Sequence, residues 1–272
     1  MPHNGTVDLA LEIGIGVLVG LVMGALGGGG GIITVPALVY LLHQPPAVAT
    51  TTSLVIVGIT GIAAVAQHAR GGRVRWADGL AFGLLGAGGA VLGARVGAVA
   101  DPTWTMGLFA GLLLITAGLM WQRSGVQRRT DPEDGEARSW LTWRPFSVDL
   151  RRGLIVLAVA SGSGVLTGFF GVGGGFAIVP ALTLIMGMSM PLAVGTSLLV
   201  ITINSATGVI GRLGTDLQLD WGLIAVFTAA AVVGSLVGGR VGRRLDPTLS
   251  QRAFAVMLVL VAVYTAVSTF VL

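Results

Sequence analysis

The sequence predicts an all-α polytopic membrane protein built from two copies of one helical unit, and three observations lead to this fold class. Only 10% of the 272 residues are charged and 54% are hydrophobic, whereas a soluble domain carries roughly 25% charged residues. Apolar runs long enough to cross a hydrocarbon core of roughly 30 Å recur along the chain. A glycine- and proline-rich motif near the start returns in the second half.

The returning motif defines two repeats. Residues 24–38 (GALGGGGGIITVPAL) and 168–182 (GFFGVGGGFAIVPAL) match at nine of fifteen positions, and further short motifs follow in the same order in both halves. Internal repeats of this kind are typical of transporters. We therefore divide the chain into a first transmembrane repeat at 1–121, a polar linker at 122–152 and a second transmembrane repeat at 153–272.

Each repeat is expected to contain five helical segments, of which the second is a short half-helix that follows the glycine run. Glycine is a poor residue for a helix interior and proline cannot continue the hydrogen-bond ladder, so the motif predicts a break inside an apolar segment. The expected segments are 9–26, 35–42, 46–67, 76–98 and 103–121 in the first repeat, and 153–170, 179–187, 190–211, 221–244 and 249–271 in the second.

The arginines predict how the repeats are oriented. All sixteen basic residues other than histidine are arginines. If the linker is cytoplasmic and each broken segment enters and leaves on one side, fourteen arginines lie inside and two outside; if the broken segment crosses once, the count is eleven against five. The positive-inside rule therefore favours an inverted-topology repeat.

Several classes of function are disfavoured by composition. The chain has no cysteine and three histidines, which excludes disulfides and thiol chemistry and argues against a metal site. No cofactor is expected. The carboxylates and histidines show no acid/base pairing and no hydrolase motif, so an enzyme is not expected. The positive net charge does not indicate nucleic-acid binding, because the arginines lie between apolar segments, where orientation signals belong.

The glycine breaks are candidate anion sites. Unpaired N–H groups at a helix start attract anions, and glycine lets a ligand approach the backbone closely. Close helix packing is the alternative role for such glycines. The pattern favours a functional break, with the two breaks meeting near the membrane midplane. The candidate glycines are Gly29, Gly30, Gly31, Gly173, Gly174 and Gly175.

Polar side chains in and after the breaks are candidate ligands. Hydroxyls in the first turns of the next helix are able to donate to an oxyanion, but they are equally able to bond to their own helix carbonyls. Asn204 and its counterpart Thr60 lie farther along that helix, where substrate contact and interhelical bonding are both open. The candidates are Thr34, Thr52, Ser53, Thr196, Ser197 and Asn204.

A few ionisable residues near helix ends are candidate gate or coupling groups. His68, Arg70 and Arg212 lie at matched helix ends, as gate residues or as topology markers. Asp78 and Glu12 are the carboxylates best placed for proton coupling, although each is close enough to a helix end to be interfacial.

The duplicated G-x-GGG-x(4)-P-A-L, the A-x-x-T-S-L that follows, and the G-x-R-x-G before the Asp-Pro loops resemble the sulfite exporter TauE/SafE family, also called the toluene sulfonate uptake permease family. The resemblance covers nearly the whole chain except 122–152. It implies a multi-pass carrier of small sulfur-containing anions in a bacterial-type cytoplasmic (inner) membrane. Gly28 is replaced by Val172 and Thr34 by Ile178 in the second copy, so the resemblance implies an asymmetric site.

The expected function is secondary transport of a small inorganic or organic sulfur anion, such as sulfite or an organosulfonate, by alternating access between the two repeats. Protons are a candidate coupling ion, and membrane lipid is the expected surrounding. An anion channel is the alternative, and an intramembrane enzyme a more distant one. The sequence does not define the oligomeric state, the substrate or the direction of transport.

Overall fold

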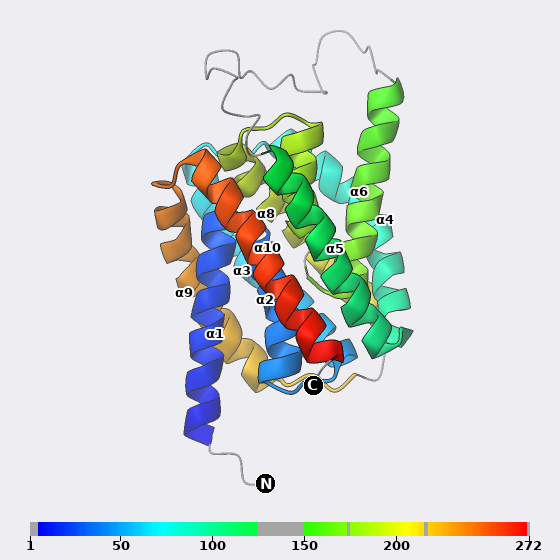
Figure 1. Cartoon of the computed structure of the whole chain (residues 1–272), viewed down its shortest axis with the longest axis vertical. Helices are drawn as coiled ribbons and strands as arrows, with labels where there is room; N and C mark the ends of the chain where they lie inside the picture. Colours follow the sequence, from blue (N-terminus) through cyan, green and yellow to red (C-terminus); the bar gives the residue numbers. More distant parts are fainter. Residues whose placement is uncertain (1–4, 124–149, 173–174, 215–216, 271–272) are drawn as a thin grey trace.

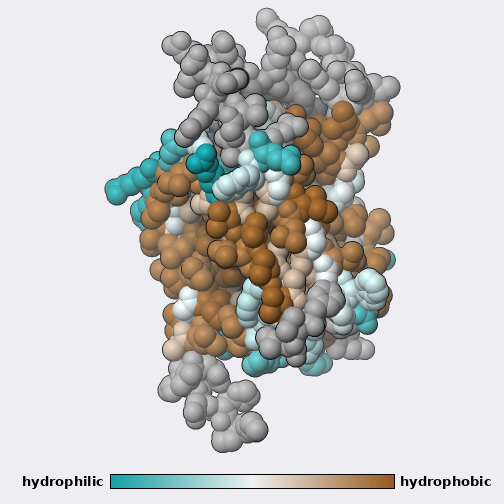
Figure 2. Space-filling view, in the orientation of Figure 1, coloured by the Kyte–Doolittle hydropathy of each residue, from teal (hydrophilic) through white to brown (hydrophobic). Residues whose placement is uncertain are grey.

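The computed structural model describes residues 5–123, 150–172, 175–214 and 217–270, and within them the protein is helical. Seven of the described helices are long and apolar enough to cross a membrane. Hydrophobic side chains cover the middle of the face seen in Figure 2, and hydrophilic ones gather toward its two ends. This surface is that of a polytopic all-α membrane protein.

The two repeats contain matching elements in the same order. The first repeat has α1 (Gly5–Leu26), α2 (Gly29–Pro36) ending in a π-helical turn η1 (Ala37–Leu41), α3 (Pro46–Arg70), α4 (Trp76–Val99) and α5 (Pro102–Arg123). The second has α6 (Leu150–Phe170), α7 (Gly175–Pro180) ending in η4 (Ala181–Ile185), α8 (Met190–Gly211), α9 (Trp221–Gly242) and α10 (Pro247–Phe270).

Corresponding helices run in opposite directions. Along the α3–α8 contact, Gly58 lies against Ser205 and Gly61 against Thr202, so the two helices are antiparallel. In Figure 1, α1 and α5 rise from the end of the molecule that carries the N-terminus, whereas their counterparts α6 and α10 descend toward it. In these pairs, a helix of the first repeat therefore runs opposite to its counterpart in the second.

The repeats are held together by helices of one repeat that pack on helices of the other. The first helix of each repeat packs in parallel on the fourth helix of the other: α1 on α9 and α6 on α4. Glycines make these contacts close, since a Cβ on Gly20 would overlap the backbone of Ala231 and one on Gly93 the backbone of Val165. Small residues that let backbones approach are the usual basis of helix association in membranes.

The expected half-helix begins earlier than predicted. The sequence predicts non-helical backbone through Gly29–Gly31, but α2 starts at Gly29, and the break is confined to Gly27 and Gly28. The helix folds back along α1, where a Cβ on Gly30 would meet Val19 and Met23. These glycines are helical, and their lack of side chains lets the helices of the hairpin pack closely. The conformation that breaks the helix is that of Gly27, whose φ is +77°.

Proline sets the other end of each half-helix. Pro36 and Pro180 lack a backbone N–H, and each is followed by a π-helical turn. The amide of Leu42 donates to the carbonyl of Ala37, five residues earlier, at 3.1 Å. Widening of a helix by one residue in this way is typical of a local disturbance in the hydrogen-bond ladder.

Candidate functional site

The tips of the two hairpins meet inside the molecule. Gly28, at the tip between α1 and α2, contacts the backbone of Gly175 at the start of α7, and Gly31 contacts the carbonyl of Val172. The sequence correctly predicts that the two breaks come together. Gly173 and Gly174 lie outside the described residues. Because the tips are in direct contact, the described glycines leave no space between them for a ligand in this conformation.

Each tip rests on the first turns of a long helix from the other repeat. Gly27 packs on Val194 and Ser197 of α8, and Gly171, whose φ is +68°, packs on Thr50 of α3. Since α3 and α8 are antiparallel, their first turns lie toward opposite ends of the molecule. There are therefore two tip sites, at corresponding positions of the two repeats, rather than one.

The first tip site is built around Arg212, and we call it the Arg212 site. The side chain is 3% exposed. Its Nη1 donates to the carbonyl of Ala47 at 3.1 Å and to the hydroxyls of Thr50 and Thr51 at 2.7 and 2.8 Å, and its Nη2 donates to the carbonyl of Gly168 at 3.1 Å. Arg212 thereby ties the end of α8 to the start of α3 and the end of α6.

The Arg212 site keeps a positive charge inside an apolar protein. Arg212 follows the last residue of the spanning helix α8. Burial lowers the pKa of its guanidinium to about 10, so the side chain stays protonated at neutral pH. Hydrogen bonds to a charged group are stronger than those between neutral groups. A buried cation surrounded by hydroxyls is a chemically suitable environment for an oxyanion.

Two candidate ligands on the same turns of α3 are buried without partners. Thr52 and Ser53 are 0% exposed, and neither hydroxyl has a hydrogen-bond partner among the described residues. Their counterparts on α8 are satisfied: Thr196 accepts from the amide of Arg75 at 3.1 Å, and Ser197 donates to the carbonyl of Val194 at 2.8 Å. At these two pairs of matched positions, the unpartnered hydroxyls are therefore those of α3.

The second tip site is built around His68 and Arg73, and we call it the His68 site. His68 is the counterpart of Arg212 but lies at the opposite end of the molecule, next to Gly195 of α8. A small cavity of about 20 Å³ opens here and is also lined by Val194 and Ser250. His68 and Arg70 lie in the last turn of α3 and Arg212 directly follows α8. Because α3 and α8 are antiparallel, Arg212 lies at the opposite end of the molecule from the other two.

Asn204 is a further unpartnered group near the centre of α8. It is 0% exposed, and neither its amide oxygen nor its amide nitrogen has a partner among the described residues. It lies against Gly86 of α4, where an added Cβ would be 3.1 Å from Oδ1. Its counterpart Thr60 and its neighbour Ser205 are likewise buried and unpartnered in the described chain. Buried polar groups of this kind normally have partners.

The remaining candidates have local roles in this conformation. The hydroxyl of Thr34 donates to the carbonyl of Gly30 at 2.9 Å, within its own helix. Asp78 is 1% exposed, and its Oδ2 accepts from Nε of Arg75 at 2.7 Å. Because the amide of Arg75 also binds Thr196, Asp78 is connected to the first turns of α8. Arg70 is exposed.

Sequence reasoning missed Thr50 and Thr51, which hold Arg212, and Gly27 and Gly171, which form the hairpin turns. The run of three threonines at 50–52 was the available signal, since three hydroxyls in one turn of an apolar helix exceed what helix packing needs. Among the described residues, no group of three or more His, Asp or Glu side chains is placed to hold a metal ion.

Two interlocked repeats of membrane-spanning helices, each with a helical hairpin that ends near buried polar groups, define a multi-pass membrane protein of the transporter class. The chain matches the family model described as "Sulfite exporter TauE/SafE" over residues 12–265. It therefore belongs to the sulfite exporter TauE/SafE family.

Curated relatives carry transporter names. A "Probable membrane transporter protein" of Xylella fastidiosa is 35% identical over 264 residues, 94% of each chain. "Probable membrane transporter protein YunE" of Bacillus subtilis is 27% identical over 269 residues, 92% of each chain. A probable membrane transporter protein of Methanocaldococcus jannaschii is 25% identical over 260 residues, 92% of this chain and 91% of the relative. No solved structure matches this chain.

Proposed function

We propose that this protein is a secondary transporter of a small sulfur-containing oxyanion, such as sulfite or an organosulfonate, in the cytoplasmic membrane. Family membership supports an anion substrate. The observation that carries the proposal is the Arg212 site: a buried cation bonded to two threonine hydroxyls, on the same turns of α3 as the unpartnered hydroxyls of Thr52 and Ser53.

The site offers the chemistry that an oxyanion needs. A sulfite or sulfonate group has three oxygens that accept hydrogen bonds, and charge-assisted bonds from a guanidinium are among the strongest available. An arriving anion would displace the threonine hydroxyls and accept the hydrogen bonds that the Nη atoms of Arg212 now donate to them. The hydroxyls so released, together with Thr52 and Ser53, would then donate to the anion.

Alternating access is supported by the difference between the tip sites. At the Arg212 site, the buried Arg212 side chain lies between α3, α6 and α8 and joins them by hydrogen bonds. At the His68 site, a small cavity remains beside basic side chains. In an inverted-topology repeat, the two ends exchange these arrangements when one repeat rocks against the other. We propose that the Arg212 end is sealed in this conformation and that the His68 end is the next to open.

Flux measurements with purified protein in liposomes test the proposal. We expect saturable uptake of sulfite that is competed by organosulfonates, and loss of that uptake in Arg212→Lys, which keeps the charge but cannot form the fork of bonds to Ala47, Thr50 and Gly168. Arg240→Lys is the matched control, because the Arg240 guanidinium binds only the carbonyl of Leu236 within its own helix among the bonds described. Equal uptake by the two variants would show that Arg212 does not take part in binding the anion.

The same preparation separates the alternatives. Large single-channel currents without saturation would indicate an anion channel, which needs weak binding and a continuous pore. Turnover of an added sulfur compound or lipid phosphate by the purified protein would indicate an enzyme.

A further inference from the structure

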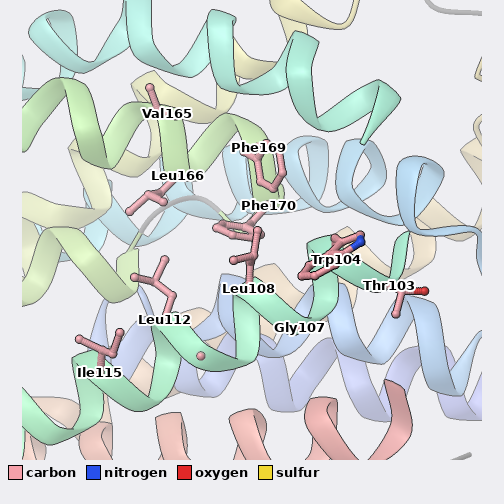
Figure 3. A pocket seen from close by; sticks show the side chains of 11 residues that line it. Thr103, Trp104, Gly107, Leu108, Leu112, Ile115, Val165, Leu166, Phe169 and Phe170 are labelled. Atoms are coloured by element: carbon pink, nitrogen blue, oxygen red, sulfur yellow. The ribbon is translucent and has the colours of Figure 1, made fainter. Parts of the chain in front are cut away.

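A large apolar groove lies between α5 and α6, on the surface of the molecule (Figure 3), and we call it the α5/α6 groove. Its volume is about 840 Å³. One wall is the face of α5 that carries Gly107 and Gly111, and the other is formed by Val165, Leu166 and Phe169 of α6. The groove is far larger than the cavity at the His68 site and has no part in the proposed transport step.

The recess exists because α5 lacks side chains where it faces α6. Gly107 and Gly111 are one helical turn apart, and a Cβ added at Gly111 would meet nothing within 4 Å. At the matching positions of α10 the chain carries Arg252 and Val256. The residue after Val256, Met257, reaches the hairpin of its neighbouring repeat and lies against Gly29. The two glycines that form the recess are thus present on α5 and absent from its counterpart α10.

The groove has one polar end and a long apolar body. Thr103 and Trp104 lie at the start of α5, next to Asp101, whose carboxylate accepts from the amides of both residues. The Trp104 side chain is 74% exposed, and tryptophan is enriched at the level of lipid headgroups. From this end the groove runs into the spanning part of α5 toward Ile115. Its polarity follows that of a lipid, with a headgroup end and a hydrocarbon end.

We propose that the α5/α6 groove is a binding site for one acyl chain of a membrane phospholipid, with the headgroup held near Thr103 and Trp104. Both walls belong to apolar helices, so the medium that reaches the groove is hydrocarbon, and water gains no hydrogen bonds there. A flexible chain fills the recess above Gly107 and Gly111 that no side chain of this protein fills.

A bound chain contacts the end of the α6–α7 hairpin. Phe169 and Phe170 line the groove immediately before the turn at Gly171. Phe170 packs on Phe109 with ring centroids 5.4 Å apart, and the carbonyl of Gly168, two residues before Phe170, accepts a hydrogen bond from Arg212. The acyl chain therefore supports the segment of α6 that forms one wall of the Arg212 site.

The site is tested by native mass spectrometry of the whole protein, purified from membranes in mild detergent. We expect the wild type to retain one phospholipid and Gly111→Leu, which fills the recess, to retain it with occupancy lower by at least about tenfold. Gly118→Leu is the matched control: it lies on the same helix, a Cβ there also meets nothing within 4 Å, and it is outside the groove. It should retain the lipid.

The outcomes are distinguishable from those of the transport proposal, because lipid retention is measured without substrate. Equal occupancy in Gly111→Leu and Gly118→Leu, or no retained phospholipid in the wild type, would overturn the site. A wild-type dimer that becomes monomeric in Gly111→Leu would assign the groove to a second copy of the chain and would also overturn it. If Gly111→Leu is poorly folded, the smaller Gly111→Val makes the same test.

Discussion

The contact between the hairpin tips predicts the effect of adding a single methyl group at Gly28. The φ of Gly28 is −63°, a conformation that alanine adopts without strain, so Gly28→Ala changes only the space at the tip. That space is occupied: the new Cβ would overlap the Cα, the carbonyl carbon and the carbonyl oxygen of Gly175. These are backbone atoms that cannot rotate away as a side chain would.

The magnitude follows from that overlap. Overpacking in a well-packed interior costs typically about 1–3 kcal/mol, whereas replacing glycine by alanine in an open helix position stabilises by roughly 0.5–1 kcal/mol. Gly14→Ala is the matched control, because its Cβ would meet nothing within 4 Å. We expect the two variants to differ by about 2–4 kcal/mol in the free energy of unfolding, with Gly28→Ala the less stable.

Thermal unfolding of the two variants in the same detergent, followed by tryptophan fluorescence, measures this difference. At about 2–4 °C per kcal/mol for a chain of this size, the midpoints should differ by roughly 4–16 °C. Equal midpoints would show that the tips are not in rigid contact and would refute the packing described at Gly28.

Three further predictions concern the polar groups and the orientation. Asn204→Leu should leave the midpoint of unfolding unchanged or raise it, because it removes a buried amide that has no partner within the described part of the chain, while sulfite uptake is lost; retained uptake would show that Asn204 is not a ligand. Asp78→Asn should make uptake independent of an imposed pH gradient, whereas Glu12→Gln should not; the reverse result would assign coupling to Glu12. Because the chain has no cysteine, Thr103→Cys should react with a membrane-impermeant thiol reagent on intact cells and Arg70→Cys only after permeabilisation; labelling of both from one side would contradict the crossing of the membrane by α4, and the opposite pattern would contradict a cytoplasmic linker.

Much of the fold could be predicted because it depends on local composition and on the motifs that occur in both halves of the sequence. The long helices were found within a few residues, and the order of matching motifs predicted two equivalent halves. The arginines predicted that corresponding helices run in opposite directions, and in the structure Arg73 and Arg212 belong to opposite ends. These signals depend on hydropathy and on charge, which act residue by residue.

The parts that could not be predicted depend on which helix of one repeat meets which helix of the other. The sequence does not show that Gly31 is helical, because the close approach of Val172 that requires a glycine there comes from the other repeat. For the same reason the sequence leaves Arg212 as either a gate residue or a topology marker, and its partners Thr50 and Thr51 are known only from the structure. Local pattern places the candidate residues on helices, and the pairing of the repeats gives them their partners.

The exchange of helices between the repeats has a consequence for biosynthesis. The glycine face of α1 has its partner on α9, and Gly20 meets Ala231 across 211 residues of chain. At about 5–20 residues per second of synthesis, that partner emerges roughly 10–40 s after Gly20. During this interval the small-residue surface of α1 is in the bilayer before α9 has been synthesised. The nascent chain therefore depends on the insertion machinery or on transient lipid contacts to avoid pairing with the wrong helix. A truncated chain that ends before α9 would keep that surface exposed, which makes it a ready substrate for membrane quality-control proteases.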